Sequence, residues 1–317
     1  MRNNKKFLAF GLGLIVILGG CSIGTDNTKS SEIETKTTEH PGEEQQIAMN
    51  TENLVSVQDY NGEGYALRDG EETDKIAEEN REDIEVAVKK FFKEEYKTEV
   101  IVHNLVGAVD GVTVFVKSVG EPHFYSFAIV PIDTKSKTVK TDEVRSQDGQ
   151  VETAISGALY AMSFEQEFNK LDEYFEIITE KYAITGTPIE AIENVGAKGF
   201  TTPYYYINPA GDIFDELNKL YLKNPDVNKQ DIKDFLLENE FQPDDILLTV
   251  YLYMKDSDTA PSQEVFDSVV SDFETMEDIP HGKYSILLND NYIDATRAIG
   301  VKQNTLGRSV PNEIIKD

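Results

Sequence analysis

The spacing of apolar residues predicts that regular structure begins near Leu54, and a helix with one apolar face is expected first. Thr73 or Asp74 is the predicted N-terminal cap of this helix. Its apolar positions recur at intervals of three and four, as one face of a helix requires: Ile84, Ala87, Val88, Phe91, Phe92 and Tyr96. An amphipathic helix should therefore open the folded part of the chain.

A run of strands should follow this helix. Residues 100–106 and 112–116 have the composition of strands, and Asp110-Gly111 between them is a two-residue hairpin signal. Residues 124–132 are apolar on both faces, as in a central strand, and residues 139–144 form a weaker fourth strand. A helix followed by such a meander predicts the α+β class with an antiparallel sheet over residues 54–147.

The remaining residues, 148–317, predict long central helices and a second α+β part with antiparallel strands. Residues 150–182 are helical with two apolar stripes, and Ser163 with Gln166 resembles a capping box, so a break is expected there. Further elements are predicted as follows: helices at 213–222, 231–238 and after Pro261, and strands at 246–254 and 284–288. No period of 20 to 50 residues repeats, which argues against a solenoid.

The first twenty residues have the three regions of a bacterial signal peptide. Arg2, Lys5 and Lys6 precede an apolar run of twelve residues, 7–18, whereas a membrane-spanning helix needs roughly twenty. The sequence Leu18-Gly19-Gly20-Cys21 resembles the lipobox of bacterial lipoproteins. We therefore expect cleavage between Gly20 and Cys21 and lipidation of Cys21, with an ordinary secretory signal as the alternative.

Residues 21–53 are predicted to be a lipidated cysteine followed by a disordered tether. The segment is polar and has no apolar period, so burial of its side chains does not offset the entropy lost on ordering. Cys21 is the single cysteine, which excludes an intramolecular disulfide and a cysteine-zinc cluster. The predicted partner of Cys21 is the lipid bilayer, and the predicted location is the extracytoplasmic face of the cell membrane.

The charge of the chain excludes nucleic acid as a partner. Thirty Lys and Arg residues stand against 58 Asp and Glu residues, for a net charge of −28. Removal of residues 1–20 removes three positive charges and no negative one, so 27 minus 58 leaves −31. Such a field repels nucleic acid and anionic headgroups and favours cationic partners.

The sequence contains no common catalytic motif, so neither a catalytic residue nor a cofactor is predicted. His40 lies in the predicted tether and His281 stands alone. His103 and His123 occupy strand positions that could bring them together in a metal or acid/base site, although ordinary core or surface histidines are the alternative.

Two short segments could bind ligands. Asn289-Asp290-Asn291 with Asp294 is rich in oxygen ligands for calcium, but it lacks the central Gly and distal Glu of an EF-hand loop, and a plain turn is the alternative. Tyr204-Tyr205-Tyr206 lies between two prolines and could bind a sugar, a peptide or a wall polymer. Because successive strand residues alternate faces, some of these tyrosines should belong to the core.

Several segments resemble an uncharacterised lipoprotein family of Gram-positive bacteria. These are Val57-Gln58-Asp59-Tyr60, the helix start at 73–77, Val88-Lys89-Lys90-Phe91-Phe92, residues 106–111 and 130–135, Leu288-Asn289-Asp290-Asn291-Tyr292-Ile293, and residues 309–316. The resemblance covers nearly everything after the tether. It implies membrane attachment and brings no catalytic residue with it.

These observations favour a non-enzymatic surface lipoprotein that binds a protein, a peptide or a wall component. Two other classes remain as alternatives. A solute-binding receptor of a transporter would share the length and the anchor, but its lobes usually alternate strands and helices. A wall-polymer hydrolase could act through two carboxylates about 5 to 9 Å apart, which leave no local motif.

Overall fold

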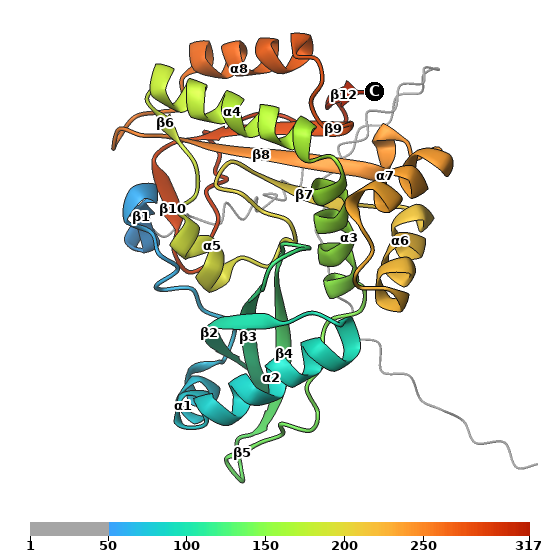
Figure 1. The fold of residues 1–317 in the computed structure, drawn as a ribbon. Coiled ribbons are helices and arrows are strands. Elements are labelled where there is room, and N and C mark those ends of the chain that lie inside the picture. The colour runs from blue at the N-terminus through green and yellow to red at the C-terminus, as the bar shows by residue number, and fades with distance from the viewer. Residues whose placement is uncertain (1–50) are drawn as a thin grey trace, which may run out of the picture. The chain divides into compact units, whose positions relative to one another are not determined.

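The computed structural model describes residues 51–317, so the predicted signal peptide, Cys21 and most of the predicted tether lie outside the described residues. The described residues belong to one compact unit. Within the described part, helices pack on two main sheets and two short strands pair beside them (Figure 1). This arrangement confirms the predicted α+β class. None of the helices between residues 51 and 317 is both long and apolar enough to cross a membrane.

The N-terminal part contains two helices and a four-stranded antiparallel meander. The helices are α1 (Glu71–Glu79) and α2 (Arg81–Tyr96). The sheet has the order β2-β3-β4-β5, formed by Val100–Ala108, Gly111–Ser118, Tyr125–Asp133 and Thr138–Val139. Helix α2 buries Ile84, Val88, Phe92 and Tyr96 on one face. The predicted meander and apolar helix face are thus both present.

The predicted N-cap of this helical region is wrong by three to four residues, because Gly70 is the N-cap of the first helix. Helix α1 begins at Glu71, and the chain breaks at Asn80 before α2 begins. The Thr73 hydroxyl donates to the Ala108 carbonyl at 2.7 Å, and the Asp74 carboxylate accepts from the Gly107 amide. The two predicted capping residues therefore tie α1 to β2, a contact that sequence periodicity does not report.

The predicted hairpin turn is displaced by one residue. Ala108 pairs with Gly111, so Val109 and Asp110 form the turn and Gly111 belongs to β3. A Cβ atom at Gly111 would lie 2.6 Å from the carbonyl oxygen of Val130 on β4. The glycine is required by this close approach between strands rather than by the turn.

Six helices follow in the second part: α3 (Gln150–Ser163), α4 (Glu165–Lys181), α5 (Ile189–Val195), α6 (Asp212–Lys223), α7 (Lys229–Glu238) and α8 (Gln263–Thr275). The predicted break near Ser163 is confirmed. The capping box that suggested it does not form, because Ser163 is the last residue of α3 and its hydroxyl donates to the Tyr160 carbonyl at 2.9 Å.

The second sheet is built around β8 (Ile246–Met254). Its other strands are β6 (Ile184–Thr185), β7 (Tyr205–Pro209), β9 (Gly282–Asn289), β11 (Leu306–Arg308) and β12 (Ile314–Lys316). Both β6 and β7 pair antiparallel with β8, and β11 and β12 pair antiparallel with β9. The pair β8–β9, however, is parallel. Helix α8 connects these two strands, and a crossover of that length allows the chain to re-enter in the same direction.

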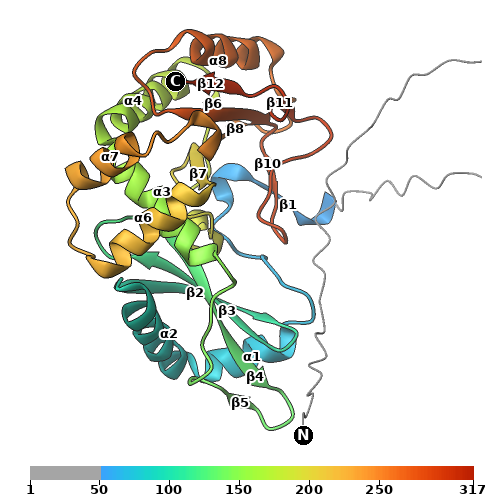
Figure 2. The ribbon, with the colours of Figure 1, turned by 90° about the vertical axis from the view of Figure 1, so that its right-hand side faces the viewer.

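The start of the described chain lies against its C-terminal third. Strand β1 (Leu54–Ser56) pairs antiparallel with β10 (Tyr292–Asp294). Three short 3₁₀ helices complete the fold, at Thr51–Asn53, Val57–Asp59 and Pro243–Asp245. Figure 2 shows β1 and β10 on the side of the second sheet away from α6 and α7.

Strand β8 separates two apolar clusters because its side chains alternate between faces. Its even-numbered residues, Ile246 to Met254, belong to the main core that the helices cover. Tyr251 and Tyr253 point to the other face and join a smaller cluster with Val57, Tyr60, Ala191, Ile293 and Ala295. The candidate site lies on this second face.

Candidate functional site

The structure separates the three consecutive tyrosines that the sequence singled out. Tyr205 is 1% exposed and belongs to the main core. Its hydroxyl donates to Asp172 at 2.8 Å, and its ring stacks on Phe168 and Phe175 with centroids 6.0 and 5.7 Å apart. Tyr204 stacks on Phe175 with centroids 5.0 Å apart. Tyr205 is therefore a structural residue, as alternation along a strand predicted for part of the triplet.

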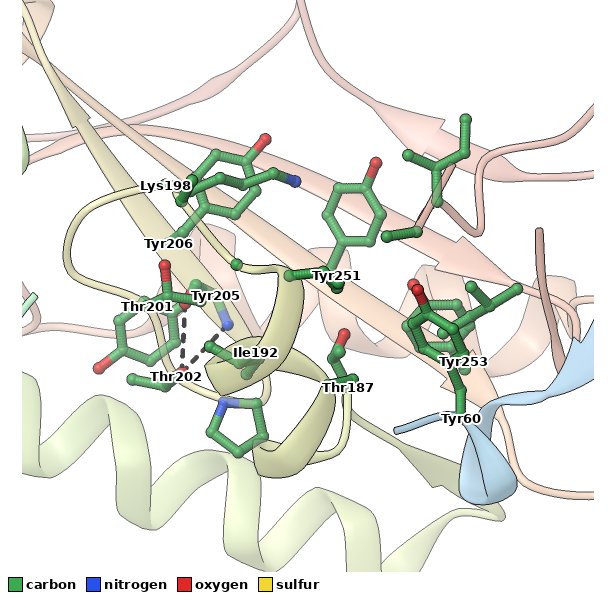
Figure 3. Close-up of a pocket in the computed structure, with 18 residues that line it drawn as sticks. Tyr60, Thr187, Ile192, Lys198, Thr201, Thr202, Tyr205, Tyr206, Tyr251 and Tyr253 are labelled. Atoms are coloured by element: carbon green, nitrogen blue, oxygen red, sulfur yellow. Dashed lines mark hydrogen bonds between the residues drawn. The ribbon is translucent and has the colours of Figure 1, made fainter. Parts of the chain in front are cut away.

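Tyr206 points to the opposite face and forms part of a pocket of about 100 Å³. The pocket lies between β7 and β8 on one side and α5, the loop 196–203, Tyr60 and the segment 293–299 on the other (Figure 3). Tyr206, Tyr251, Tyr253 and Tyr60 follow one another along it. The ring centroids of Tyr206 and Tyr251 are 6.1 Å apart, and those of Tyr251 and Tyr253 are 6.4 Å apart. A row of aromatic rings therefore lines the pocket.

Burial and hydrogen bonds hold these tyrosines in place and keep them neutral. The Tyr60 hydroxyl donates to the Ala295 carbonyl at 3.3 Å. Gly300 lies directly against Tyr253, since a Cβ atom there would be 2.2 Å from the ring. Desolvation raises the pKa of Tyr60, Tyr251 and Tyr253 well above the ordinary tyrosine value. Their hydroxyls, which are protonated at neutral pH in any case, therefore stay protonated in alkaline solution as well and can donate hydrogen bonds.

Lys198 provides the positive charge at one end of the row. Its Nζ lies 4.3 Å from the ring centroid of Tyr206 and 5.1 Å from that of Tyr251. The residue as a whole is exposed, but its amine is turned toward the two rings (Figure 3). Desolvation by the surrounding protein lowers the pKa of the Lys198 amine. This amine thus sits over aromatic faces at the wall of the pocket.

The loop that carries Lys198 is fixed on both sides. Gly199 and Tyr125 of β4 exchange two backbone hydrogen bonds, of 2.9 and 3.0 Å. Gly199 has φ of +70°, and a Cβ atom there would lie 2.9 Å from Cα of Ala154 in α3. Only glycine combines this backbone conformation with so close an approach. The loop therefore holds Lys198 at a defined position.

A second polar cluster lies on the side of α5 that faces the first sheet. Lys117 Nζ and Glu193 Oε1 are 2.8 Å apart, and His103 Nδ1 lies 3.9 Å from Glu193 Oε2. The hydrogen bond from Lys117 is the largest cause of the lowered pKa of Glu193. His103 and His123 also interact electrostatically with Glu193 and lower its pKa to a smaller extent. His103 lies in β2, whereas His123 lies in the segment just before β4 and not at the predicted strand position, and both interact with the same carboxylate.

The environment of these histidines favours their neutral form. Desolvation is the main cause that lowers the pKa of both His103 and His123. The charge of Lys117 also lowers these pKa values, and the charge of Glu193 raises them without reversing the shift. Nε2 of His103 is buried and has no hydrogen-bond partner within the described chain. Between residues 51 and 317, no group of three or more His, Cys, Asp and Glu side chains is arranged to hold a metal ion. The cluster links α5 to the first sheet.

The two carboxylates considered for calcium have separate protein partners. Asp290 forms an ion pair with the buried Lys302 and accepts from the amide of Tyr292 at 2.9 Å. Asp294 accepts from the amide and hydroxyl of Thr296, at 3.1 and 2.7 Å. These are the contacts of a closed turn, and the structure does not bring the two side chains to a shared ligand.

His281 is not among the residues that line the pocket. The carbonyl of His281 accepts from the Tyr160 hydroxyl at 2.7 Å, and its ring lies near Phe164 and Phe241. His40 lies outside the described residues.

Sequence reasoning missed Lys198, Tyr251 and Tyr60. The alternation of residues 246–254 does indicate that Tyr251 and Tyr253 share a face, which was an available signal. It does not indicate what covers that face. Lys198 carries no local signal, because its importance depends on two rings contributed by other strands.

Comparisons with known proteins agree on one family. The family model "Protein of unknown function (DUF1672)" matches residues 47–316. The structure is similar to the crystal structure of a DUF1672 family protein from Staphylococcus aureus subsp. aureus Mu50, with a TM-score of 0.67 and 18% identity. That match covers 84% of this chain and 98% of the other. No curated protein matches. The predicted resemblance to a family without a known activity is confirmed.

Proposed function

We propose that this chain, which belongs to the DUF1672 family of proteins of unknown function, is a lipid-anchored extracytoplasmic module that binds a partner without chemical turnover. The observation that carries the binding proposal is the pocket lined by Tyr60, Tyr206, Tyr251 and Tyr253. Tyrosine combines a large rigid apolar surface with a polar tip, and it is enriched among the residues that dominate binding energy.

The size of the pocket favours one group of a larger partner over a whole small molecule. Its volume is about 100 Å³, whereas sites that enclose drug-sized ligands measure roughly 300 to 1,000 Å³. A cavity of about 150 Å³ admits a benzene ring. The pocket therefore suits one side chain or chain end of a peptide, a protein or a wall component. This size argues against the solute-receptor alternative. The second sheet argues against it as well, because such receptors usually have parallel sheets and β8–β9 is the one parallel pair among the described strands.

The side chains around the pocket also favour binding over hydrolysis. No Asp or Glu lines it among the described residues. A wider groove of about 510 Å³ includes Glu63, Asp74 and Glu78. In that groove, Asp74 accepts a hydrogen bond from Gly107, and Glu78 is paired with Arg81 at 2.8 Å. Two of the three carboxylates thus have structural partners, which does not suit an acid/base pair that must exchange protons with a substrate.

The anchor part of the proposal is supported by the sequence Leu18-Gly19-Gly20-Cys21. Cells supplied with labelled palmitate should incorporate the label into the wild-type protein. Cys21→Ala should remove the label and release the protein or leave it unprocessed. Equal labelling of the variant would refute the anchor and leave the binding proposal untouched.

The binding proposal can be tested with arrays of short synthetic peptides and oligosaccharides. The probe is the mature chain from residue 21 onward, carrying Cys21→Ala so that it remains free of lipid. A ligand that uses the pocket should lose tenfold or more in affinity with Tyr206→Ala or Tyr251→Ala. Tyr182→Ala is the matched control, because Tyr182 is the C-cap residue directly after α4 and is not among the residues that line the pocket. Equal affinity of all four proteins for every ligand, or turnover of a ligand by the wild type, would contradict the proposal.

A further inference from the structure

The pocket has different chemistry at its two ends. At one end, the amine of Lys198 lies over Tyr206 and Tyr251. At the other, Tyr60 and Tyr253 are joined by apolar side chains, Ile293 and Ala298 among them. Figure 3 shows Lys198 and Tyr206 at one end of the row of rings and Tyr60 at the other. A group that fills the pocket therefore contacts a cation at one end and an apolar surface at the other.

The Lys198 amine lacks the carboxylate partner that two other lysines of the described chain have. Lys117 is paired with Glu193 at 2.8 Å, and the buried Lys302 is paired with Asp290. For Lys198, the described residues supply two aromatic faces and no carboxylate within salt-bridge distance. An ammonium group has three N–H donors, and a ring face stabilises its charge without replacing the hydrogen bonds that an anion would accept. The described residues therefore leave the N–H donors of Lys198 open to solvent or to an acceptor on a ligand.

We propose that Lys198 binds the free carboxylate of a chain end, and that the small apolar group beside this carboxylate lies along Tyr251 toward Tyr253. The inference rests on the proposed function and specifies the chemistry of the group that enters the pocket. An ion pair with hydrogen bonds from the amine would complete the coordination of Lys198. The apolar end of the pocket would bury the adjoining side chain.

The charge of the whole protein narrows the kind of partner that carries this carboxylate. With a net charge of −28, the protein repels polyanions such as phosphate polymers and anionic lipid surfaces at long range. A single carboxylate at the end of a neutral or cationic chain avoids most of this repulsion. We therefore assign a peptide-like chain end with a free carboxylate, and inorganic phosphate serves as the comparison anion.

The test uses methyl-labelled NMR of the mature Cys21→Ala chain. Ile192, Ile293 and Ile299 line the pocket and report on it, whereas the exposed Ile177 and Ile315 lie outside it. The probes are acetylated tripeptides that end in Ala or Val, each with a free carboxylate or a terminal amide. The carboxylate forms should shift the three pocket signals and bind at least tenfold more tightly than the amides. Inorganic phosphate should leave these signals unchanged.

Lys198→Met should abolish the preference for the carboxylate, because methionine keeps the apolar stem and removes the charge. Lys198→Arg keeps a positive charge and should retain part of this preference. The control is Lys181→Met, which removes a lysine that lies 4.6 Å from the ring centroid of Tyr182, away from the pocket. Thermal melting of each variant verifies that it is folded.

Four results would overturn the inference. The first is that the amide peptides bind as tightly as the carboxylate peptides. The second is that Lys198→Met still prefers the carboxylate peptides over the amides. In both cases, the proposed function would survive if Tyr206→Ala still weakened binding. If no carboxylate peptide shifted the pocket signals, the inference would also fall, and the array experiment would decide the proposed function separately. If inorganic phosphate bound at the same site, the pocket would be a less selective anion site and not a site for a carboxylate chain end.

Discussion

The two faces of strand β8 differ in how completely they are covered. On the face with Leu248, Val250 and Leu252, long helices pack over the strand, and these residues are at most 1% exposed. On the face with Tyr251 and Tyr253, the cover consists of α5, the loop 196–203, the segment after β1 and the segment around β10. The same nine-residue strand thus forms part of a closed core on one side and the wall of a pocket on the other.

The difference arises from the kind of element that covers each face. A long amphipathic helix presents a continuous apolar stripe, and its side chains interdigitate with those of the sheet at high density. Helix α5 has seven residues, and the loop after it contributes backbone, short side chains and the single long side chain of Lys198. Such pieces do not fill the space above large tyrosine rings. A functional cavity can therefore arise from irregular cover on an ordinary sheet.

The largest expected effect separates Tyr205 from Tyr206, which are adjacent in sequence but lie on opposite faces. Tyr205→Ala should lower the free energy of unfolding by about 3 to 5 kcal/mol, as for other large buried aromatics. Tyr206→Ala should cost much less stability and act mainly on binding. Urea denaturation of both variants measures this difference. Equal losses would show that the pocket face is as tightly packed as the core face.

A conservative variant refines the same comparison. Tyr205→Phe keeps the ring but removes the hydroxyl that donates to Asp172. Loss of one partner of a part-buried hydrogen bond costs about 1 to 3 kcal/mol. Desolvation also raises the pKa of Asp172, and loss of the Tyr205 donor should raise it further. A Tyr205→Phe protein as stable as the wild type would contradict this account.

An intermediate effect is expected at Gly199, which positions Lys198. Gly199 and Gly149 have similar φ values of +70° and +75°, but a Cβ atom at Gly149 would meet nothing within 4 Å. Gly149→Ala should therefore cost only the backbone strain, about 1 to 2 kcal/mol. Gly199→Ala adds contact with Ala154 and should cost about 1 to 3 kcal/mol more.

Gly199→Ala should also weaken carboxylate binding, because the loop must shift to relieve the contact with Ala154. The two alanine variants are compared by chemical denaturation and by the affinity for a carboxylate tripeptide. Identical losses of stability, or undisturbed binding in Gly199→Ala, would show that the loop is less constrained than the contacts indicate.

The smallest expected effect is the pH dependence of stability that arises from the histidines in the cluster between α5 and the first sheet. His103 and His123 have lowered pKa values in the folded protein, caused first by desolvation. Above the ordinary histidine pKa of about 6.5, both folded and unfolded forms are neutral and stability does not depend on these groups. As the pH falls through that value, the unfolded chain takes up protons that the folded chain excludes, so stability decreases.

The measurement for this prediction is the melting temperature between pH 8 and pH 5. The double variant His103→Gln and His123→Gln should lose less stability over this interval than the wild type. If the two proteins show the same pH dependence, the histidines are not responsible for the acid-side loss.

The sequence by itself determined the regular elements and the class of the fold. Strand β8 has the predicted bounds, Ile246–Met254, and the break between α3 and α4 was expected near Ser163. Alternation also indicated that the tyrosines at 204–206 would divide between core and surface. These successes share one reason: periodicity records whether each side chain of a local element is buried.

Only the tertiary structure decided which faces meet. The parallel pairing of β8 and β9, the pairing of β1 with β10, and the contact of Lys198 with Tyr206 and Tyr251 all join segments far apart in the chain. Apolar periodicity carries no information about the partner that covers a face. The pocket exists because a loop, a short helix and the start of the described chain converge on one side of a strand, and that convergence is a property of long-range packing.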